Sequence, residues 1–424
     1  MASPRPAEPD TDEEAAPGRG PLGYLRALGP GLISGASDND PTTVATMSVV
    51  GASTVYGLSW LVVLIYPMLA AIQMISAQVG VASRHGLQRC VRSRYGRSWG
   101  LVLLISVVAV NLVTIAADLE AGAASLALLF HVDLRWFVVP YGALLLSVLL
   151  FGSYDNVQRV LKYVLLVFGA YIVAAFLAHP DWSAVLRATV QPKLSLSTTY
   201  IQGALALLGT TLTSYAYVWE TIEESEEHPP VSSLGLARAD AGVGMFVAVA
   251  IFWFTLVATG ATLGVRHEQV QTAEQAARAL QPAAGSLASD LFAVGLLASS
   301  IIAVPVLAAT TGYVLGQEFG WRRGLSKRVS RARLFYGTIV ATVLLAVLAS
   351  FTGIRPIQLL FVASIAGGLG TPISLAMLLL IARDRATMRG HPVGFVLTAI
   401  GWATFTLVTA ISLYFLWQQL GGWL

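Results

Sequence analysis

The chain has 424 residues, of which 56% are hydrophobic and 12% charged, with a formal net charge of +3. Soluble domains carry about a quarter charged residues, and apolar runs long enough to cross a bilayer recur along this chain, which excludes a soluble protein. The runs are continuous, as in LVVLIYPMLAAIQMI, and lack the alternation of a transmembrane β-barrel. We therefore predict an all-α polytopic membrane protein.

The N-terminal residues 1–23 are rich in Pro, Ala and acidic side chains without an apolar run, which predicts a disordered tail and no cleavable signal peptide. Hydropathy then predicts eleven spans, each of roughly 20 or more mostly apolar residues. In chain order they cover residues 31–55, 58–82, 99–130, 135–152, 156–178, 199–219, 239–264, 286–316, 334–351, 355–382 and 394–418.

The basic residues predict the orientation. Most of the 26 Lys and Arg residues fall in the tail and in the connections on its side of the membrane. The positive-inside rule then places the N-terminus in the cytoplasm, the C-terminus outside and the chain in the cell (inner) membrane. Because the positive charge is a bias of the loops, we expect the lipid bilayer and no nucleic acid as a partner.

Cysteine and histidine offer few candidates for a metal site inside the membrane. The single cysteine, Cys90, lies in an Arg-rich connection, so neither an intrachain disulfide nor a cysteine metal cluster can form. All six histidines fall in predicted connections, which leaves the spans without an imidazole.

Small and polar residues interrupt the first span, at GASDNDPTT, and the sixth, at GTTLTSYAY. Five spans separate the two starts, so the two halves of the chain would be inverted relative to each other. Matched interrupted helices of this kind mark the binding site of secondary transporters. We predict five-helix repeats over residues 24–185 and 198–383, followed by an extra helix over 394–418.

Asp40 is the first candidate for the site. An ionisable group at mid-membrane costs at least ~2.5–3.5 kcal/mol and suggests a function. Pro41 should unwind the helix at Asp40 and free backbone carbonyls. Together with the hydroxyls of Ser37, Thr42 and Thr43, these groups form an all-oxygen cluster that suits a hard divalent cation. A capping Asp before a kink proline is the alternative, and the matched break in the sixth span favours the cation site.

Other polar residues would form the opposite wall, the pathway or the surroundings of the ion. Asp118 and Glu120 could relay protons, surround the metal or pair with a cation, and Glu220 and Glu223 could attract a departing ion. Asp290 should be interfacial. The residues expected in the pathway or around the ion are Asp38, Thr42, Ser214, Tyr215, Asp118, Glu120, Glu220 and Glu223.

The stretch GPGLISGASDNDPTTVAT resembles the first helix of the natural resistance-associated macrophage protein (NRAMP) family of divalent-metal transporters. That family carries Asp-Pro-Gly-Asn in its first helix and Met-Pro-His in its sixth, where this chain has Asp40-Pro41-Thr42-Thr43 and Thr213-Ser214-Tyr215. The resemblance implies a leucine-transporter-type fold, a 5+5 inverted repeat with an eleventh helix. It also implies that the chain is not an enzyme and carries metal as substrate, without a cofactor.

The departures from the family pattern resemble its magnesium-transporting branch, in which a stretch like TTLTSYAYVWETIEESEE occurs. Thr213 replaces a methionine thioether, a soft ligand that favours transition metals. The ligand set implied by the resemblance is Asp40, Thr43, Ser37, Thr210 and Thr213. The family's sixth-helix histidines correspond to Tyr215 and Glu220, which implies uptake that needs no proton gradient.

The leading hypothesis is a secondary transporter for Mg²⁺, and also Mn²⁺, that works by alternating access around Asp40. The alternative is a proton-coupled Mn²⁺/Fe²⁺ importer. A sodium-coupled amino-acid carrier is more distant, because Asp40 would repel a substrate carboxylate. A Mg²⁺-dependent membrane enzyme acting on a diphosphate would need basic residues at membrane depth, and the spans contain none there.

Overall fold

The computed structural model describes residues 39–151, 169–227, 230 and 234–421, and the regular structure of these residues is helical. Six described segments are long and apolar enough to cross a membrane, and two more are shorter apolar helices, α7 (Arg135–Phe151) and α16 (Arg333–Ala349). The predicted all-α membrane architecture is confirmed. The long helices are α4 (Ser59–Ser83), α6 (Arg97–Phe130), α12 (Leu234–Thr262), α15 (Ala288–Phe319), α17 (Pro356–Arg383) and α18 (Phe395–Gly421).

Two predicted spans contain breaks where the sequence placed them. The described part of the first span is α3 (Pro41–Thr54), which begins directly after Asp40. The sixth span is divided into α10 (Thr198–Thr211) and α11 (Ser214–Glu227), separated by Leu212 and Thr213. Most of the fifth span lies outside the described residues, and its end, 169–177, is helical.

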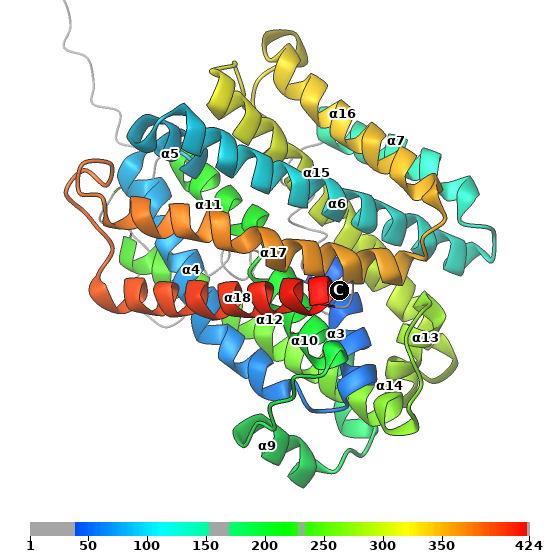
Figure 1. The fold of residues 1–424 in the computed structure, drawn as a ribbon. Coiled ribbons are helices and arrows are strands. Elements are labelled where there is room, and N and C mark those ends of the chain that lie inside the picture. Colours follow the sequence, from blue (N-terminus) through cyan, green and yellow to red (C-terminus); the bar gives the residue numbers. More distant parts are fainter. Residues whose placement is uncertain (1–38, 152–168, 228–229, 231–233, 422–424) are drawn as a thin grey trace, which may run out of the picture.

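The broken helices lie in the middle of the bundle, where α3 packs against α12, α10 and α17 (Figure 1). Glycine makes this packing possible. A Cβ atom on Gly51 would lie 2.6 Å from the Leu256 carbonyl oxygen, and one on Gly209 would lie 2.0 Å from the Ser364 carbonyl oxygen. The backbones of α3 and α12, and of α10 and α17, therefore touch directly, as small residues permit in membrane helices.

The Arg-rich connection between the second and third spans differs from the expected loop. It forms a short helix, α5 (Leu87–Tyr95), because Leu87, Cys90 and Val91 share a face that is buried against the bundle, while Arg89 and Arg94 are exposed. Burial raises the pKa of the Cys90 thiol to about 11.

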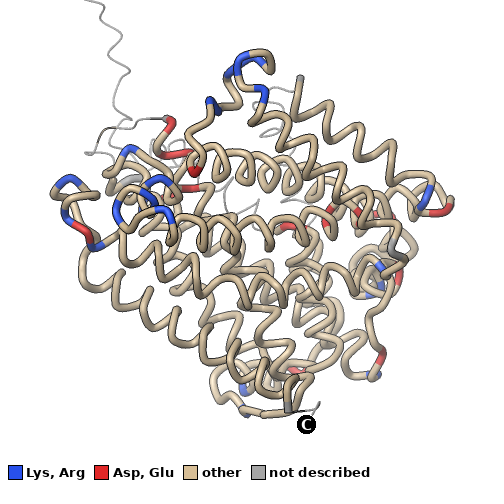
Figure 2. The backbone as a smooth tube through the Cα atoms, turned by 45° about the horizontal axis from the view of Figure 1, so that its top comes forward, with Lys and Arg blue, Asp and Glu red and all other residues tan. Residues whose placement is uncertain are grey.

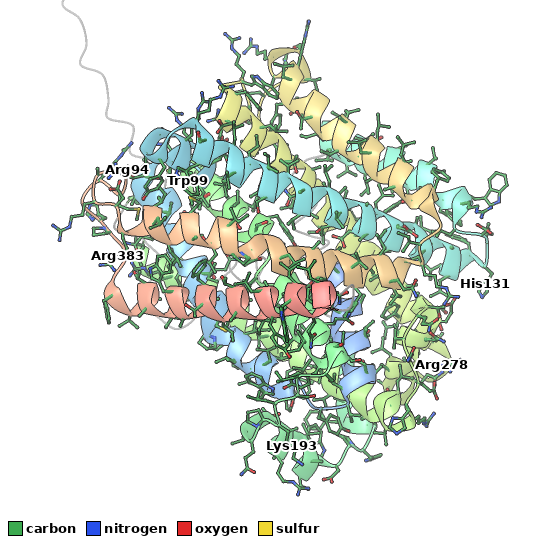
Figure 3. The ribbon with its side chains drawn as sticks, in the orientation of Figure 1. Arg94, Trp99, His131, Lys193, Arg278 and Arg383 are labelled. Atoms are coloured by element: carbon green, nitrogen blue, oxygen red, sulfur yellow. The ribbon has the colours of Figure 1, made fainter. Side chains whose placement is uncertain are left out.

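Basic residues gather where α5 lies, together with the connections 320–332 and 384–394; we call this the basic end of the bundle (Figure 2). Arg94 on α5 pairs with Asp384, with 3.1 Å between Nε and the carboxylate oxygen. Arg94 and Arg383 mark this end, and His131 and Arg278 mark the opposite one (Figure 3).

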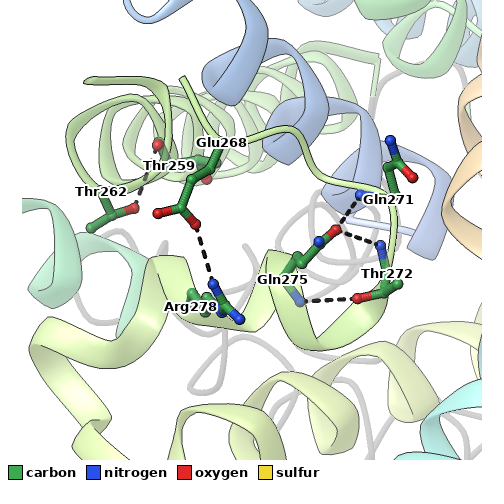
Figure 4. Close-up of polar contacts among 7 residues, drawn as sticks. All are labelled: Thr259, Thr262, Glu268, Gln271, Thr272, Gln275 and Arg278. Atoms are coloured by element: carbon green, nitrogen blue, oxygen red, sulfur yellow. Dashed lines mark hydrogen bonds and ion pairs between the residues drawn. The ribbon is translucent and has the colours of Figure 1, made fainter. Parts of the chain in front are cut away.

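Short helices organise the opposite end: α9 (Trp182–Val190), α13 (Ala273–Ala277) and α14 (Gln281–Ala284). Thr272 and Gln275 form a reciprocal capping box at the start of α13, and Arg278 donates to Glu268 at 3.2 Å (Figure 4). Because α13 contacts α3, α6 and α15, this connection covers the end of the bundle nearest the start of α15. Asp290, in the first turn of α15, is exposed there, as expected for an interfacial residue.

Candidate metal-ion site

Asp40 caps the N-terminus of α3. Its backbone is extended, with φ −69° and ψ 165°, and the Thr43 N–H donates to its Oδ1 at 2.7 Å. Pro41 has no N–H to lose at the first position of the helix, so the break costs little there. The N-terminal end of the helix dipole favours a negative charge at this place. The carboxylate is only 2% exposed, so its charge lies inside the protein.

Residues of α10 and α11 complete the surroundings of Asp40. The Tyr215 hydroxyl donates to Asp40 Oδ2 at 3.0 Å, and the hydroxyls of Thr43 and Thr210 share a hydrogen bond of 2.9 Å. Thr213 lies in the break between the two helices and is 4% exposed. The structure therefore brings Asp40, Thr43, Thr210 and Tyr215 together from three helices, at the two breaks.

The side-chain atoms of these residues that could bind a cation are all oxygens. The Leu212 N–H donates to the Leu208 carbonyl, but because α10 ends at Thr211, the later carbonyls of its last turn, including that of Thr210, have no following turn to donate to them. The carbonyl of Leu212 is satisfied from α17 by the Thr371 hydroxyl at 2.9 Å. The C-terminal end of α10 also carries partial negative charge. A carboxylate, hydroxyls and helix-end carbonyls are the ligands that hard divalent cations prefer.

Asp118 on α6 contacts α3 through Thr42. Its Oδ1 accepts from the Thr42 hydroxyl at 2.6 Å, and its backbone carbonyl accepts from Ser300 at 2.6 Å. Ser300 in turn accepts from the Tyr141 hydroxyl at 2.8 Å. Asp118 is fully buried, and its Oδ2 has no hydrogen-bond partner among the described residues. Thr42, which holds Asp118, is next to Thr43, which belongs to the Asp40 cluster. The second carboxylate therefore lies beside that cluster.

Glu120 does not join Asp118. Two residues apart on a helix, their side chains point to different faces. Glu120 is 1% exposed, and its Oε2 has no hydrogen-bond partner in the described part of the chain. The two acids, which the sequence predicts to share one role, therefore lie in different surroundings on α6.

The remaining candidates are more scattered. Ser214 is fully buried at the start of α11, and its hydroxyl oxygen has no partner among the residues that the structure describes. Glu220 and Glu223 lie farther along α11 and are half-buried. Ser37 and Asp38 lie outside the described residues.

Three hydroxyls that hold the breaks were not singled out in the sequence. Ser299 on α15 donates to the Asn39 carbonyl at 2.7 Å, and Ser364 on α17 bonds Thr46 of α3 at 2.6 Å. Thr371, two turns beyond Ser364 on α17, donates to the Leu212 carbonyl as described above. The available signal was the presence of hydroxyl residues inside apolar spans eight and ten, which by itself does not distinguish a partner from back-bonding.

Comparisons with known proteins agree with this architecture. The family model described as natural resistance-associated macrophage protein-like matches residues 31–418. The chain is 28% identical to a divalent metal cation transporter, MntH, of Deinococcus radiodurans, covering 99% of this chain and 98% of that one. It is 27% identical to the MntH of Ralstonia nicotianae, covering 94% and 92%.

Solved structures show the fold. A manganese transporter of Eremococcus coleocola superposes with a TM-score of 0.74 at 19% identity, covering 92% of this chain and 86% of that one. MhsT, solved with L-phenylalanine, superposes with a TM-score of 0.59 at 15% identity, covering 92% and 97%. The expected leucine-transporter-type fold, with its 5+5 inverted repeat and an eleventh helix, is confirmed, while the residue limits assigned to the two repeats remain a prediction.

Proposed function

Because the chain belongs to the natural resistance-associated macrophage protein (Nramp) family, whose model it matches over residues 31–418, we propose that it carries divalent metal cations across the membrane, with Mn²⁺ as the first substrate to test. Its relatives are named divalent metal cation transporters, and a solved structure with the same fold is a manganese transporter, which favours Mn²⁺ over the Mg²⁺ that the sequence suggests first. Family membership agrees with the expectation of a transporter and not an enzyme, for which the metal is a substrate and no cofactor is implied.

The observation that carries the proposal is the buried Asp40 carboxylate between two helix breaks. Asp40 would bind the ion with the hydroxyl or carbonyl oxygens of Thr43, Thr210 and Thr213, and with Ser37 as a further ligand. Half-helices such as α10 and α11, 14 residues each, can tilt separately on either side of such a site. Alternating access then requires the halves to open toward one side of the membrane at a time.

The pathway residues and the orientation belong to the same proposal. Asp118 and Thr42 lie beside the site, while Glu220 and Glu223 follow α11 away from it. The positive-inside rule assigns the basic end to the cytoplasm, and the C-terminus to the outside, in the inner membrane.

Mg²⁺ is a second candidate, because the donor atoms described around Asp40 are all oxygens. Thr213 occupies the position of the methionine in the family's Met-Pro-His pattern. A methionine thioether is soft and favours transition metals, whereas a hydroxyl would suit a partly hydrated hard ion. Uptake without a proton gradient goes with this candidate. It is supported by the sequence, in which the predicted spans contain no histidine.

The test is transport into liposomes that contain a fluorescent dye for Mn²⁺ or for Mg²⁺, with a pH-sensitive dye in parallel. We expect Mn²⁺ influx with the wild-type protein and at least about a hundredfold less with Asp40→Asn, since a charged ligand is lost. Asp290→Asn, which changes an exposed carboxylate, should retain the flux.

Influx no faster than in protein-free liposomes would contradict the proposal. Mg²⁺ influx without acidification would support the second candidate. Acidification that follows Mn²⁺, with no Mg²⁺ influx, would reject it.

A further inference from the structure

Tyr215 engages the proposed ion ligand directly. In the first turn of α11 it is 5% exposed, and its hydroxyl donates to Asp40 Oδ2 at 3.0 Å. The other carboxylate oxygen, Oδ1, already accepts the Thr43 N–H at 2.7 Å. Both oxygens of Asp40 are therefore hydrogen-bonded by the protein, one from the backbone of α3 and one from a side chain of α11.

These two donors limit how Asp40 can bind a cation. An ionised carboxylate has about four lone-pair sites, so each oxygen keeps about one for a metal. The hydrogen of a donor carries positive partial charge and repels a cation on the same oxygen. A cation bound by both oxygens at once would meet the phenol hydrogen at Oδ2, whereas a cation bound by Oδ1 alone leaves the bond to Tyr215 undisturbed.

The hydroxyls that could complete the shell lie on the side of Thr43. Its side chain bonds Thr210, and its N–H marks the Oδ1 side of the carboxylate. Each oxygen of Asp40 accepts one hydrogen, but the hydroxyls of Thr43 and Thr210 lie on the Oδ1 side, whereas the group beside Oδ2 is the phenol itself. We infer that Tyr215 makes Asp40 a one-oxygen ligand and thereby selects small, octahedrally coordinated cations against Ca²⁺.

The physical basis is the difference in coordination between the ions. Ca²⁺ takes six to eight oxygens at about 2.3–2.6 Å and often uses both oxygens of a carboxylate. Mg²⁺ takes six at about 2.0–2.1 Å and keeps several waters, so one carboxylate oxygen is enough. Removal of the phenol would free Oδ2 and allow the two-oxygen contact. The inference rests on the proposed function, since it concerns the same site.

The chain offers a matched control two residues away. Tyr217 is also buried on α11, but its hydroxyl bonds Ser374 and the Thr371 carbonyl of α17. Both tyrosines can be changed to Phe with the loss of one oxygen atom, and only one of them touches Asp40. A general effect of losing a buried hydrogen bond in α11 would appear in both variants.

The experiment measures equilibrium binding of Mn²⁺, Mg²⁺ and Ca²⁺ to the purified full-length protein by calorimetry, with melting temperatures to verify folding. For Tyr215→Phe we expect the affinity for Ca²⁺ relative to Mn²⁺ to rise about tenfold, since a hydrogen bond to a charged group no longer competes. Tyr217→Phe should leave the ratio unchanged.

An unchanged ratio in Tyr215→Phe would overturn the inference. An equal loss of affinity for all three ions would also overturn it, because the phenol oxygen would then be an ordinary ligand. These results differ from failure of the proposed function, in which the wild-type protein binds none of the three ions.

Discussion

One carboxylate, Asp40, has two roles that the sequence presents as alternatives. As the N-cap of α3 it accepts the Thr43 N–H, and as the proposed ligand it keeps lone pairs for a cation. The cap holds the carboxylate in place before an ion arrives, which reduces the side-chain entropy that binding would otherwise cost. The roles are therefore compatible, and removing the carboxylate should affect both.

Thr213 allows a test of ligand softness at the residue scale. Thr213→Met would place a thioether in the break between α10 and α11, and thioethers favour softer metals. We expect binding to shift toward Cd²⁺ over Mg²⁺ by about tenfold or more, measured by calorimetry. Thr406→Met, at an exposed position on α18, is the control and should show no shift. The same result in both variants would mean that position 213 does not face the ion.

The sequence predicts part of the site. Asp40 and Pro41 stand out because a charge and a helix breaker occur in an apolar span, which is a local signal. The bond from Tyr215 to Asp40 joins positions 175 residues apart and depends on how α11 packs beside α3, so no local pattern contains it. The same holds for Asp118, whose partner Thr42 is fixed by the packing of α6.

At the scale of elements, the breaks were predictable and the short helices were not. Proline and clustered hydroxyls interrupt hydropathy over several residues, so the breaks before Pro41 and at Leu212 and Thr213 are visible in the sequence. In α5, by contrast, a buried face of few residues is masked by its arginines in any average over a long window. Burial against the bundle, a tertiary contact, decides that the segment is a helix.

Contact between α10 and α17 should be sensitive to a single methyl group. Gly209→Ala would place a Cβ 2.0 Å from the Ser364 carbonyl and 2.2 Å from the Gly368 nitrogen. Since both neighbours are backbone atoms, we expect a loss of about 3 kcal/mol in stability. The measurement is the melting temperature in detergent.

Gly337 on α16 provides the comparison, because a Cβ there meets no atom within 4 Å. Gly337→Ala should be neutral or more stable by up to about 1 kcal/mol, through helix propensity alone. Equal melting temperatures for the Gly209 and Gly337 variants would show that α10 and α17 are not in backbone contact.

The whole molecule has a basic end and an opposite end, and its proposed orientation can be tested with cysteine labels. The native Cys90 should be silent, because it is 2% exposed and burial raises the pKa of its thiol to about 11, so little reactive thiolate forms near neutral pH. A raised thiol pKa means that reactivity grows only as the pH approaches that value. The native cysteine therefore needs no replacement.

Lys193 and Arg383 are exposed at different ends of the structure (Figure 3). In intact cells whose inner membrane is accessible to the reagent from outside, a membrane-impermeant maleimide should label Lys193→Cys. Arg383→Cys should stay unlabelled until that membrane is permeabilised. The reverse pattern would place the basic end outside and would contradict the positive-inside assignment.

In the proposed mechanism the ion binds at the two helix breaks, on Asp40. The most direct measurement is a crystal structure of the protein with Mn²⁺, in which anomalous scattering locates the metal independently of any assumed ligand. We expect a peak about 2.0–2.6 Å from one oxygen of Asp40, beside Thr43 and Thr210, that is absent in Asp40→Asn. A peak at Asp118 or Glu120 instead, with none at Asp40, would contradict it.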